Sequence, residues 1–288
     1  MPYQFDALCA RFFDCDVQRN VSMAQYTSFR TGGCARALVE PRSVEALQNA
    51  LFVVHEYGIP YEVIGNGTNL LVSDAGIDAV VFRIGEAMGA IRQENGLFFA
   101  EAGASFAALA KRTVECGFMG LEWAAGIPGS VGGAIAMNAG AYGGEIKDIL
   151  VRATLMDMDG SLFEFTNQQM QFGYRKSIAA EKNYIVLEAD LALHVSSKEE
   201  VLAKMAELSA QRRLKQPLEY PSAGSTFKRP EGYFAGKLIS DAGLKGFSVG
   251  GAQVSEKHAG FVINTGNATA ADVIALTPCA IKYLKNTV

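Results

Sequence analysis

The chain lacks the features that mark secreted, metal-binding or nucleic-acid-binding proteins. Its 288 residues carry a formal net charge of −4, so there is no basic excess for a nucleic-acid surface. The five cysteines are odd in number and form no CxxC pair, and the three histidines are far apart, so neither a disulfide framework nor a metal site is predicted. The N-terminus lacks a basic segment followed by an apolar one, so we expect no signal peptide. These absences predict a cytoplasmic protein that binds neither nucleic acid nor membrane.

Glycine, in contrast, is concentrated in residues 123–144, WAAGIPGSVGGAIAMNAGAYGG, which contain no charged side chain. The interior glycines and Pro128 argue against one ordinary helix over this stretch. Glycine allows positive φ and lets another group lie against the main chain. We therefore predict that main-chain amides here face a large anionic ligand. A membrane span and a structural Gly/Ala loop are alternatives, although Asn138 and the shortage of large apolar side chains oppose the span.

The rest of the chain predicts an α+β protein. Two helices begin at serine and end at glycine, one from Ser43 to Gly58 and one from Ser105 to Gly117. Each follows a strand, so the first half is interpreted as two related lobes. The other predicted elements are strands at 61–64, 70–72, 79–84, 97–102 and 185–195, a hairpin of 152–158 with 162–165, a helix at 199–213, a helical segment at 233–244, strands at 249–254 and 260–264, and a final helix from about 270.

A loop between two of these strands, Gly65-Asn66-Gly67-Thr68-Asn69, resembles a dinucleotide fingerprint. The Rossmann interpretation fails, because the glycines should open a helix and here a second strand is expected at 70–72. Two glycines among small polar side chains still suit a diphosphate. A simple hairpin turn is the alternative.

Three further stretches, 172–177, 221–230 and 250–261, combine polar side chains with glycine. Arg175 offers a planar charged fork for a carboxylate, or else a surface salt bridge. Ser225 stands near two cations and is either a proton or anion contact or only a cap. His258 is either a substrate contact or a structural histidine.

Six stretches taken in order resemble one family, the UDP-N-acetylenolpyruvoylglucosamine reductases, over about residues 20–275. They are GNGTNLL, GIPGSVGGAIAMNAGAYGG, FGYRKS, SAGSTFKRP, AGKLISDAGLKG and GGAQVSEKHAGFVIN. The resemblance implies a flavoenzyme of peptidoglycan precursor synthesis, of the compact subtype and here expected to be a monomer. FAD lobes are expected at 1–75 and 76–207, and a substrate-binding domain at 208–288. NADPH reduces the FAD, whose N5 passes hydride to the enolpyruvyl group of a UDP-sugar.

The resemblance also implies roles for particular residues. Arg175 stabilises the enediolate that develops on the substrate carboxylate, and Ser225 protonates C2, aided by neighbouring cations. The residues implied to bind the UDP-sugar are Tyr174, Lys215, Lys228, Arg229 and His258. Those implied to bind FAD are Gly65, Asn66, Gly67, Thr68, Asn69, Gly126, Ile127, Pro128, Gly129, Ser130, Gly132, Gly133, Asn138, Gly140 and Tyr142.

One departure from the family pattern concerns the C-terminal segment, where the family places a catalytic glutamate. No glutamate follows Glu256, and Pro278 is expected to interrupt the final helix. A truncated or altered tail would leave a protein that binds FAD and UDP-sugar with impaired catalysis, which is the second hypothesis. A third is a flavin oxidase of the same fold with covalent flavin, for which Cys34 is the candidate.

Overall fold

The structure, a computed structural model, describes residues 7–287, without the side chains of residues 279 and 282–287. The chain forms two compact units. The first comprises the described residues up to Arg19, Arg36–Asn66 and Ala79–Ser209, and the second comprises Asn20–Ala35, Gly67–Asp78 and the chain from Ala210. The second unit is therefore built from three separate segments. The division of residues 1–207 into two FAD lobes stays a prediction.

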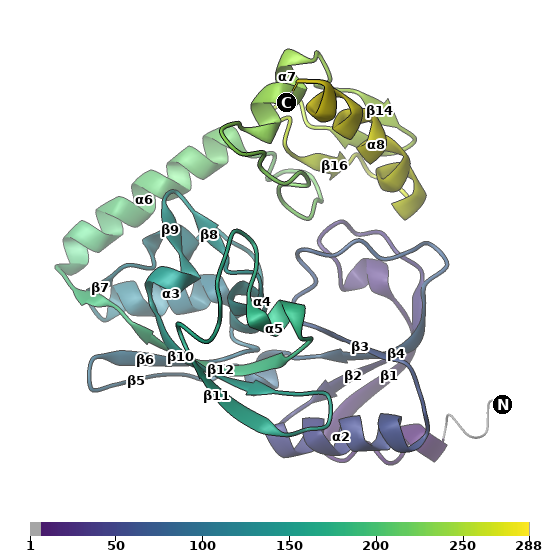
Figure 1. Ribbon diagram of the computed structural model, residues 1–288, viewed down its shortest axis with the longest axis vertical. Helices are drawn as coiled ribbons and strands as arrows, with labels where there is room; N and C mark the ends of the chain where they lie inside the picture. The colour runs from purple at the N-terminus through teal and green to yellow at the C-terminus, as the bar shows by residue number, and fades with distance from the viewer. Residues whose placement is uncertain (1–6, 288) are drawn as a thin grey trace. The chain divides into compact units, whose positions relative to one another are not determined.

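The N-terminal sheet has four strands in the order β1-β2-β4-β3 (Figure 1). Their helix, α2 (Val44–Glu56), begins where the Ser43 hydroxyl accepts the Ala46 N–H, and Gly58 follows it with φ 59°, as predicted. The apolar face of α2 is buried in the same core as β2 and β4. The strands are β1 (Cys15–Ser22), β2 (Cys34–Pro41), β3 (Tyr61–Ile64) and β4 (Ile77–Arg83).

The predicted strand at 70–72 is wrong, because these residues are irregular and the next strand is β4. β3 and β4 pair in parallel, with Tyr61 opposite Val80. A parallel pair cannot be joined by a tight turn and needs a crossover, so the hairpin alternative for Gly65–Asn69 is also wrong. The crossover carries residues 67–78 into the second unit.

The larger sheet of the first unit has five strands in the order β11-β10-β12-β6-β5 (Figure 1). Its hairpin of β10 and β11 is confirmed, with Gly160 at φ 86° in the turn. α3 (Phe106–Glu115) begins at Ser105 as predicted, and Gly117 follows it with φ 77°. The strands are β5 (Ile91–Glu94), β6 (Leu97–Glu101), β10 (Leu150–Met156), β11 (Leu162–Thr166) and β12 (Ile185–Ala192).

The strand predicted at 185–195 is shorter than expected. β12 ends at Ala192, and the chain continues as β13 (His194–Val195), which pairs with β7 (Phe118–Met119) in a separate two-stranded sheet. The apolar run continues through the break, so its composition alone does not reveal the change of partner.

The prediction that the glycine-rich stretch does not form one ordinary helix is confirmed. The stretch does contain one short helix. α4 (Val131–Ala136) is followed by the paired strands β8 (Gly140–Ala141) and β9 (Gly144–Glu145). A Cβ on Gly132 would lie 2.9 Å from Ala102 Cβ, so glycine allows α4 to pack closely against β6 and its following turn. No helix in the described part of the chain is long and apolar enough to cross a bilayer.

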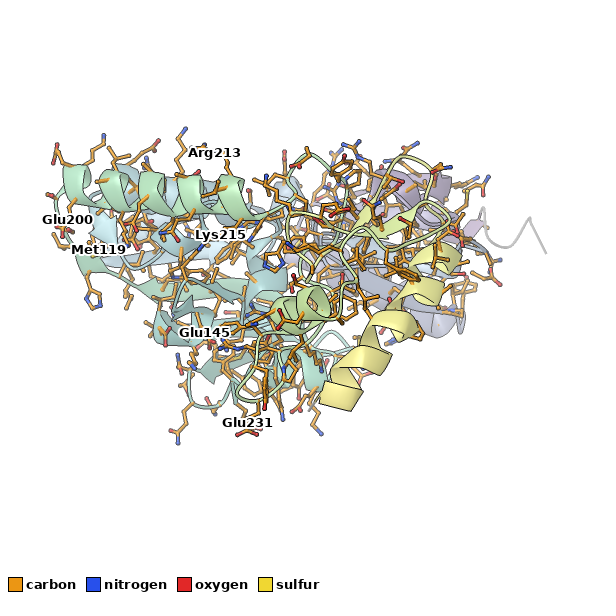
Figure 2. The ribbon with its side chains drawn as sticks, turned by 90° about the horizontal axis from the view of Figure 1, so that it is seen from above. Met119, Glu145, Glu200, Arg213, Lys215 and Glu231 are labelled. Atoms are coloured by element: carbon orange, nitrogen blue, oxygen red, sulfur yellow. The ribbon has the colours of Figure 1, made fainter. Side chains whose placement is uncertain are left out.

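The second unit contains α7 (Ala235–Asp241), a three-stranded sheet and α8 (Ala270–Thr287). α6 (Lys198–Lys215) leads into it and ends at Lys215 (Figure 2). The strand predicted at 249–254 is a hairpin, because Gly250 turns the chain at φ 52°. The strands are β14 (Ser248–Val249), β15 (Ala252–Val254) and β16 (Val262–Asn264).

The predicted interruption of the final helix at Pro278 is wrong, because α8 continues through this residue. Proline removes one main-chain hydrogen bond. Val273, Leu276 and Ala280 are buried on the core side of the helix and hold both halves in place. The side chains of residues 282–287, in the segment where the family pattern has its glutamate, lie outside the described part.

Two segments from the N-terminal part complete this core. Phe29 is buried with the apolar residues of α7 and α8, and its carbonyl accepts a hydrogen bond of 2.9 Å from Asn264 Nδ2. The Asp74 carboxylate accepts the N–H groups of Ala270 and Ala271 at 2.8 Å each and so caps α8.

Candidate functional site

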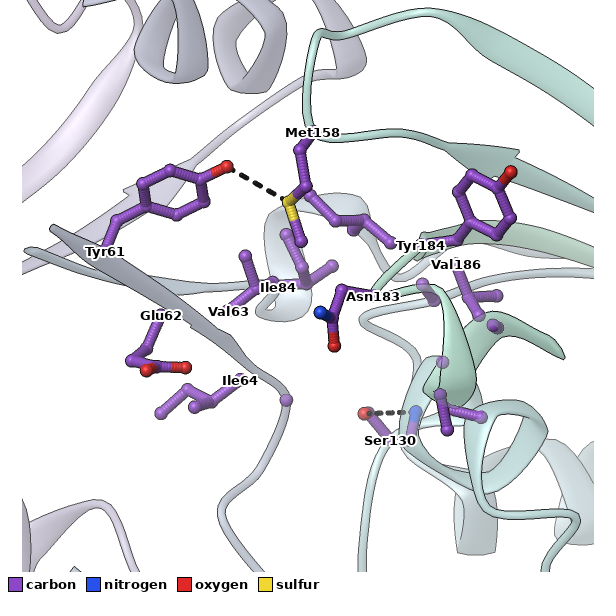
Figure 3. A pocket seen from close by; sticks show the side chains of 18 residues that line it. Tyr61, Glu62, Val63, Ile64, Ile84, Ser130, Met158, Asn183, Tyr184 and Val186 are labelled. Carbon is purple, nitrogen blue, oxygen red and sulfur yellow. Dashed lines mark hydrogen bonds between the residues drawn. The ribbon is translucent and has the colours of Figure 1, made fainter. Parts of the chain in front are cut away.

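The first unit contains a cavity of about 570 Å³, which β3 lines along its length (Figure 3). The start of α4 forms another side, and the segment from α5 (Ile178–Glu181) into β12 forms a third. The lining residues are Tyr61, Glu62, Val63, Ile64, Gly65, Ile84, Ala102, Ser130, Gly132, Gly133, Ala136, Met158, Ala179, Ala180, Asn183, Tyr184, Ile185 and Val186.

Several of the lining residues were not singled out by the sequence. Tyr61 donates from its hydroxyl to Met158 Sδ at 3.0 Å, and this pair and Tyr184 occupy opposite parts of the lining (Figure 3). Tyr61, Met158 and Tyr184 have no neighbouring motif that distinguishes them from ordinary strand and turn residues. Asn183 has φ 56°, a conformation that asparagine tolerates better than most residues, so the residue type itself is a weak signal of a turn.

Two predicted FAD residues from distant segments meet at this cavity. A Cβ on Gly65 would overlap the hydroxyl oxygen of Ser130, so a larger residue there would displace this hydroxyl from its present position. The same hydroxyl accepts the Gly133 N–H at 3.3 Å and caps α4. This approach brings the loop after β3 against the start of α4.

The amides of α4 itself are largely used inside the protein. Gly132 donates to the Ala102 carbonyl at 2.9 Å, and Gly133 donates to the Ser130 hydroxyl. Fewer main-chain N–H groups in residues 126–133 are therefore free to bind a ligand than the glycine pattern predicts.

Four amides near this meeting point remain available. In the part of the chain that the structure describes, the N–H groups of Gly65, Asn66, Gly129 and Ser130 donate no hydrogen bond. Gly65 and Ser130 line the cavity. Free main-chain N–H groups beside glycine are the donors that bind phosphate oxygens, so the residues present fit a diphosphate.

The remaining predicted FAD residues fall in several places. Gly126 and Pro128 are exposed, and Ile127 donates its N–H to the Ala124 carbonyl at 2.8 Å. Tyr142 is exposed at φ 52°. The structure places Gly67, Thr68 and Asn69 in the second unit, whereas Gly65 and Asn66 belong to the first.

Arg175 lies in a two-residue turn with Tyr174. The flanking residues Gly173 and Lys176 exchange main-chain hydrogen bonds of 3.0 and 3.2 Å. Arg175 has φ 54°, and its guanidinium lies 5.3 Å from the centre of the exposed Tyr174 ring. Among the described residues Arg175 has no acidic partner within ion-pair distance, so the surface salt bridge is not observed.

The Arg175 fork donates to two main-chain carbonyls of the glycine-rich stretch instead. Nη1 donates to Asn138 O at 3.2 Å and Nη2 to Gly140 O at 2.7 Å. Guanidinium has five N–H groups, so three of them stay available for a substrate group. Arg175 is partly buried, which strengthens its interaction with an anion relative to a fully exposed arginine.

The second unit brings Ser225 and His258 to the main chain of one residue, Gly260. Ser225 Oγ donates to Gly260 O at 3.5 Å, and the Gly260 N–H donates to His258 Nδ1 at 3.1 Å. Ser225 therefore does not serve as the N-cap of α7, whose cap position is Phe234. Burial lowers the pKa of His258, and the charge of Lys245 lowers it further, which favours the neutral ring. Because Nδ1 accepts the Gly260 N–H, the proton of the neutral ring is on Nε2.

The basic residues predicted to bind substrate are also in this unit. Lys215 is the last residue of α6, and Lys228 is exposed in the loop that follows Ser225. Arg229 donates from Nε to Tyr233 O at 3.2 Å, and its guanidinium lies 4.0 Å above the centre of the Phe234 ring.

Comparison with known protein families identifies the class of protein to which this fold and site belong. Residues 35–166 match the family model described as an FAD binding domain. Residues 216–287 match the model of the UDP-N-acetylenolpyruvoylglucosamine reductase C-terminal domain. The fold and the glycine-lined cavity are thus those of an FAD-dependent oxidoreductase with a separate C-terminal domain.

Whole-chain similarities identify the family. The chain is 49% identical to the UDP-N-acetylenolpyruvoylglucosamine reductase of Clostridioides difficile, over 91% of this chain and 86% of that protein. It is 51% identical to that of Agathobacter rectalis, over 92% and 87%. The crystal structure of the Thermus caldophilus enzyme matches with a TM-score of 0.82 at 36% identity, covering 93% of this chain and 95% of that one. The chain belongs to the UDP-N-acetylenolpyruvoylglucosamine reductase family.

Proposed function

We propose that this protein reduces UDP-N-acetylglucosamine enolpyruvate to UDP-N-acetylmuramate with NADPH and FAD. The observation that carries the proposal is the cluster of free amides at the glycine-lined cavity, within a chain that also contains the family's C-terminal domain. The hypothesis of impaired catalysis is not favoured, since the similar relatives carry the name of the reductase.

The amides of Gly65, Asn66, Gly129 and Ser130 would hold the FAD diphosphate. When bound, FAD supplies the hydride chemistry, accepting hydride from NADPH and delivering it to the alkene of the substrate. The apolar side of the cavity, which includes Val63 and Ile84, would exclude water around the bound cofactor.

Arg175 is the proposed electrophilic group. An enol ether is electron-rich and accepts hydride only if its carboxylate takes up the developing charge. The three free N–H groups of the Arg175 guanidinium would donate to that carboxylate and stabilise the enediolate. Its bonds to Asn138 O and Gly140 O hold the fork in place before the substrate arrives.

Ser225 is the proposed proton donor to C2 of the substrate. A serine hydroxyl is a weak acid, so it requires a strongly basic carbon and nearby positive charge. Lys228 and Arg229 follow it closely in sequence. With Lys215, they would also bind the diphosphate of the UDP-sugar, whereas neutral His258 and Tyr174 would contribute hydrogen bonds.

The cellular setting is also proposed. We place the protein in the cytoplasm as a monomer. The described cysteines Cys9, Cys15, Cys34 and Cys116 form no disulfide, as is usual in a reducing compartment. Cys34 is exposed and was the candidate for covalent flavin. Release of all flavin on denaturation would support non-covalent binding.

The function is tested on the purified protein in two measurements. A visible spectrum should show bound flavin, and NADPH consumption should depend on the enolpyruvyl substrate. A colourless protein that does not take up added FAD, or NADPH oxidation that is the same without substrate, would contradict the proposal.

A further inference from the structure

Asn138 ends α4 in a conformation that usually selects glycine. Its φ is 41°, its N–H donates to Ile135 O at 3.1 Å, and the N–H of Ala139 donates to Ala134 O at 2.8 Å. This pair of bonds is the Schellman arrangement, in which glycine is preferred at the position of Asn138 and asparagine is tolerated. The helix end therefore does not require the asparagine side chain.

The side chain is instead fully used inside the protein. Asn138 has no exposed surface. Its Nδ2 donates to Glu145 Oε2 at 3.0 Å and to Gly173 O at 2.9 Å, and its Oδ1 accepts the Lys147 N–H at 3.0 Å. An amide group with both N–H groups and its oxygen engaged in this way has no donor left for a cofactor.

These bonds connect Asn138 to Arg175 at two points. The main-chain oxygen of Asn138 accepts Arg175 Nη1 directly, at 3.2 Å. Its side chain holds the carbonyl of Gly173, the residue just before the turn that contains Arg175. Arg175 adopts φ 54°, which is unfavourable for a residue with a Cβ, so this turn needs support from its surroundings.

Glu145 supplies a fixed negative group behind Asn138. Its Oε2 lies 3.0 Å from Lys147 Nζ. Burial acts to raise the pKa of Glu145, but hydrogen bonds from Lys147 and Asn138 and the charges of Lys147 and Arg175 outweigh it, so the pKa is lowered. A Glu145 that stays ionised keeps Nδ2 of Asn138 oriented as a donor, and hence keeps the second N–H aimed at Gly173.

We propose that Asn138 is a positioning residue, which fixes the direction of the Arg175 guanidinium toward the substrate carboxylate without touching FAD. The inference rests on the proposed function of Arg175. It gives Asn138 a role different from the cofactor contact expected from the sequence, since all of its polar groups are occupied within the protein.

The test is Asn138→Gly, which retains the positive φ and the carbonyl that accepts Arg175 but deletes the side chain. We expect kcat to fall about 10- to 100-fold, the cost of a misplaced catalytic group, with the KM for NADPH and the bound-flavin spectrum unchanged. Asn95→Gly is the matched control, because Asn95 also has positive φ (50°) but is exposed in the turn between β5 and β6. It should leave kcat unchanged.

A structural effect is separated from a positioning effect by repeating the change in an Arg175→Lys background. If Asn138 acts through Arg175, Asn138→Gly should lower kcat there by less than about 2-fold. The same large factor in both backgrounds would overturn the inference, as would wild-type kcat in Asn138→Gly. Inactive wild-type protein would instead overturn the proposed function, on which this inference depends.

Asn138→Asp provides a second variant in case the glycine variant does not fold. It retains the acceptor for the Lys147 N–H and the size of the side chain, but it has no donor for Gly173 when ionised. The same loss of kcat with unchanged KM for NADPH is expected, and wild-type kcat in this variant would refute the role.

Discussion

The cavity makes a sharp prediction for Gly65→Ala. A Cβ at this position would occupy the place of the Ser130 hydroxyl. The hydroxyl would have to move, and its 3.3 Å hydrogen bond from the Gly133 N–H would be lost. Loss of a serine N-cap costs about 1 kcal/mol, and forcing a methyl group into a packed site costs about 1–3 kcal/mol. We expect the free energy of unfolding of the FAD-free protein to fall by about 2 kcal/mol or more.

The measurement is thermal unfolding of the FAD-free protein, followed by circular dichroism. A change of 1 kcal/mol moves Tm by about 2–4 °C in proteins near this size, so a decrease of about 4–8 °C is expected. Ser130→Gly should restore much of the loss when combined with Gly65→Ala, because glycine is a nearly equal N-cap and removes the overlap. A double variant no more stable than Gly65→Ala would refute the steric explanation.

Gly133→Ala is the matched control at the same cavity. Its Cβ would lie 3.4 Å from Ser130 Oγ, an ordinary contact, and alanine favours the helix. The FAD-free protein should therefore keep or gain stability. Since Gly133 lines the cavity, the added methyl group should weaken FAD binding, measured by the quenching of FAD fluorescence. Equal loss of stability in both alanine variants would also contradict the reasoning.

Three further predictions concern charge and proton transfer. Arg175→Lys should lower kcat by 10²-fold or more with FAD retained, because an ammonium cannot replace the planar fork; steady-state kinetics and the flavin spectrum check this. Ser225→Ala should leave bleaching of the flavin by NADPH unchanged in stopped flow but slow substrate turnover, and equal slowing of both steps would argue against a proton donor. Glu145 has a lowered pKa, so it stabilises the fold above its ordinary value of 4.5, and this contribution is lost as pH falls through the lower folded pKa. The free energy of unfolding of Glu145→Gln should therefore decrease less than that of the wild-type protein as the pH is lowered, as measured by urea titrations at a series of acidic pH values.

The sequence predicted best those features that depend on neighbouring residues. The helices after Ser43 and Ser105 were correctly located, because a serine cap and a closing glycine act within one or two turns. The hairpin around Gly160 was likewise local. The family resemblance rested on short ordered motifs, so it was independent of the errors in secondary structure.

Features set by distant partners were missed. Residues 70–72 are apolar like a strand, but the parallel pairing of β3 with β4 assigns them to a crossover. The contribution of Tyr61 and Asn183 to the cavity depends on segments that meet only in the fold. The network of Asn138 could not be predicted for the same reason, since its partner Gly173 lies 35 residues away.

The route of the chain through its two units limits how this protein can be taken apart. A fragment that starts at Ala210 would contain α7, α8 and their sheet but would lack Phe29 and Asp74. It would expose an unfilled apolar core, and the first turn of its longest helix would lose the two hydrogen bonds that the Asp74 carboxylate accepts. The C-terminal unit is therefore not a transferable cassette: a gene fusion or recombination event that moved it alone would deliver an incomplete fold, and only grafts that include the two earlier segments could transplant it.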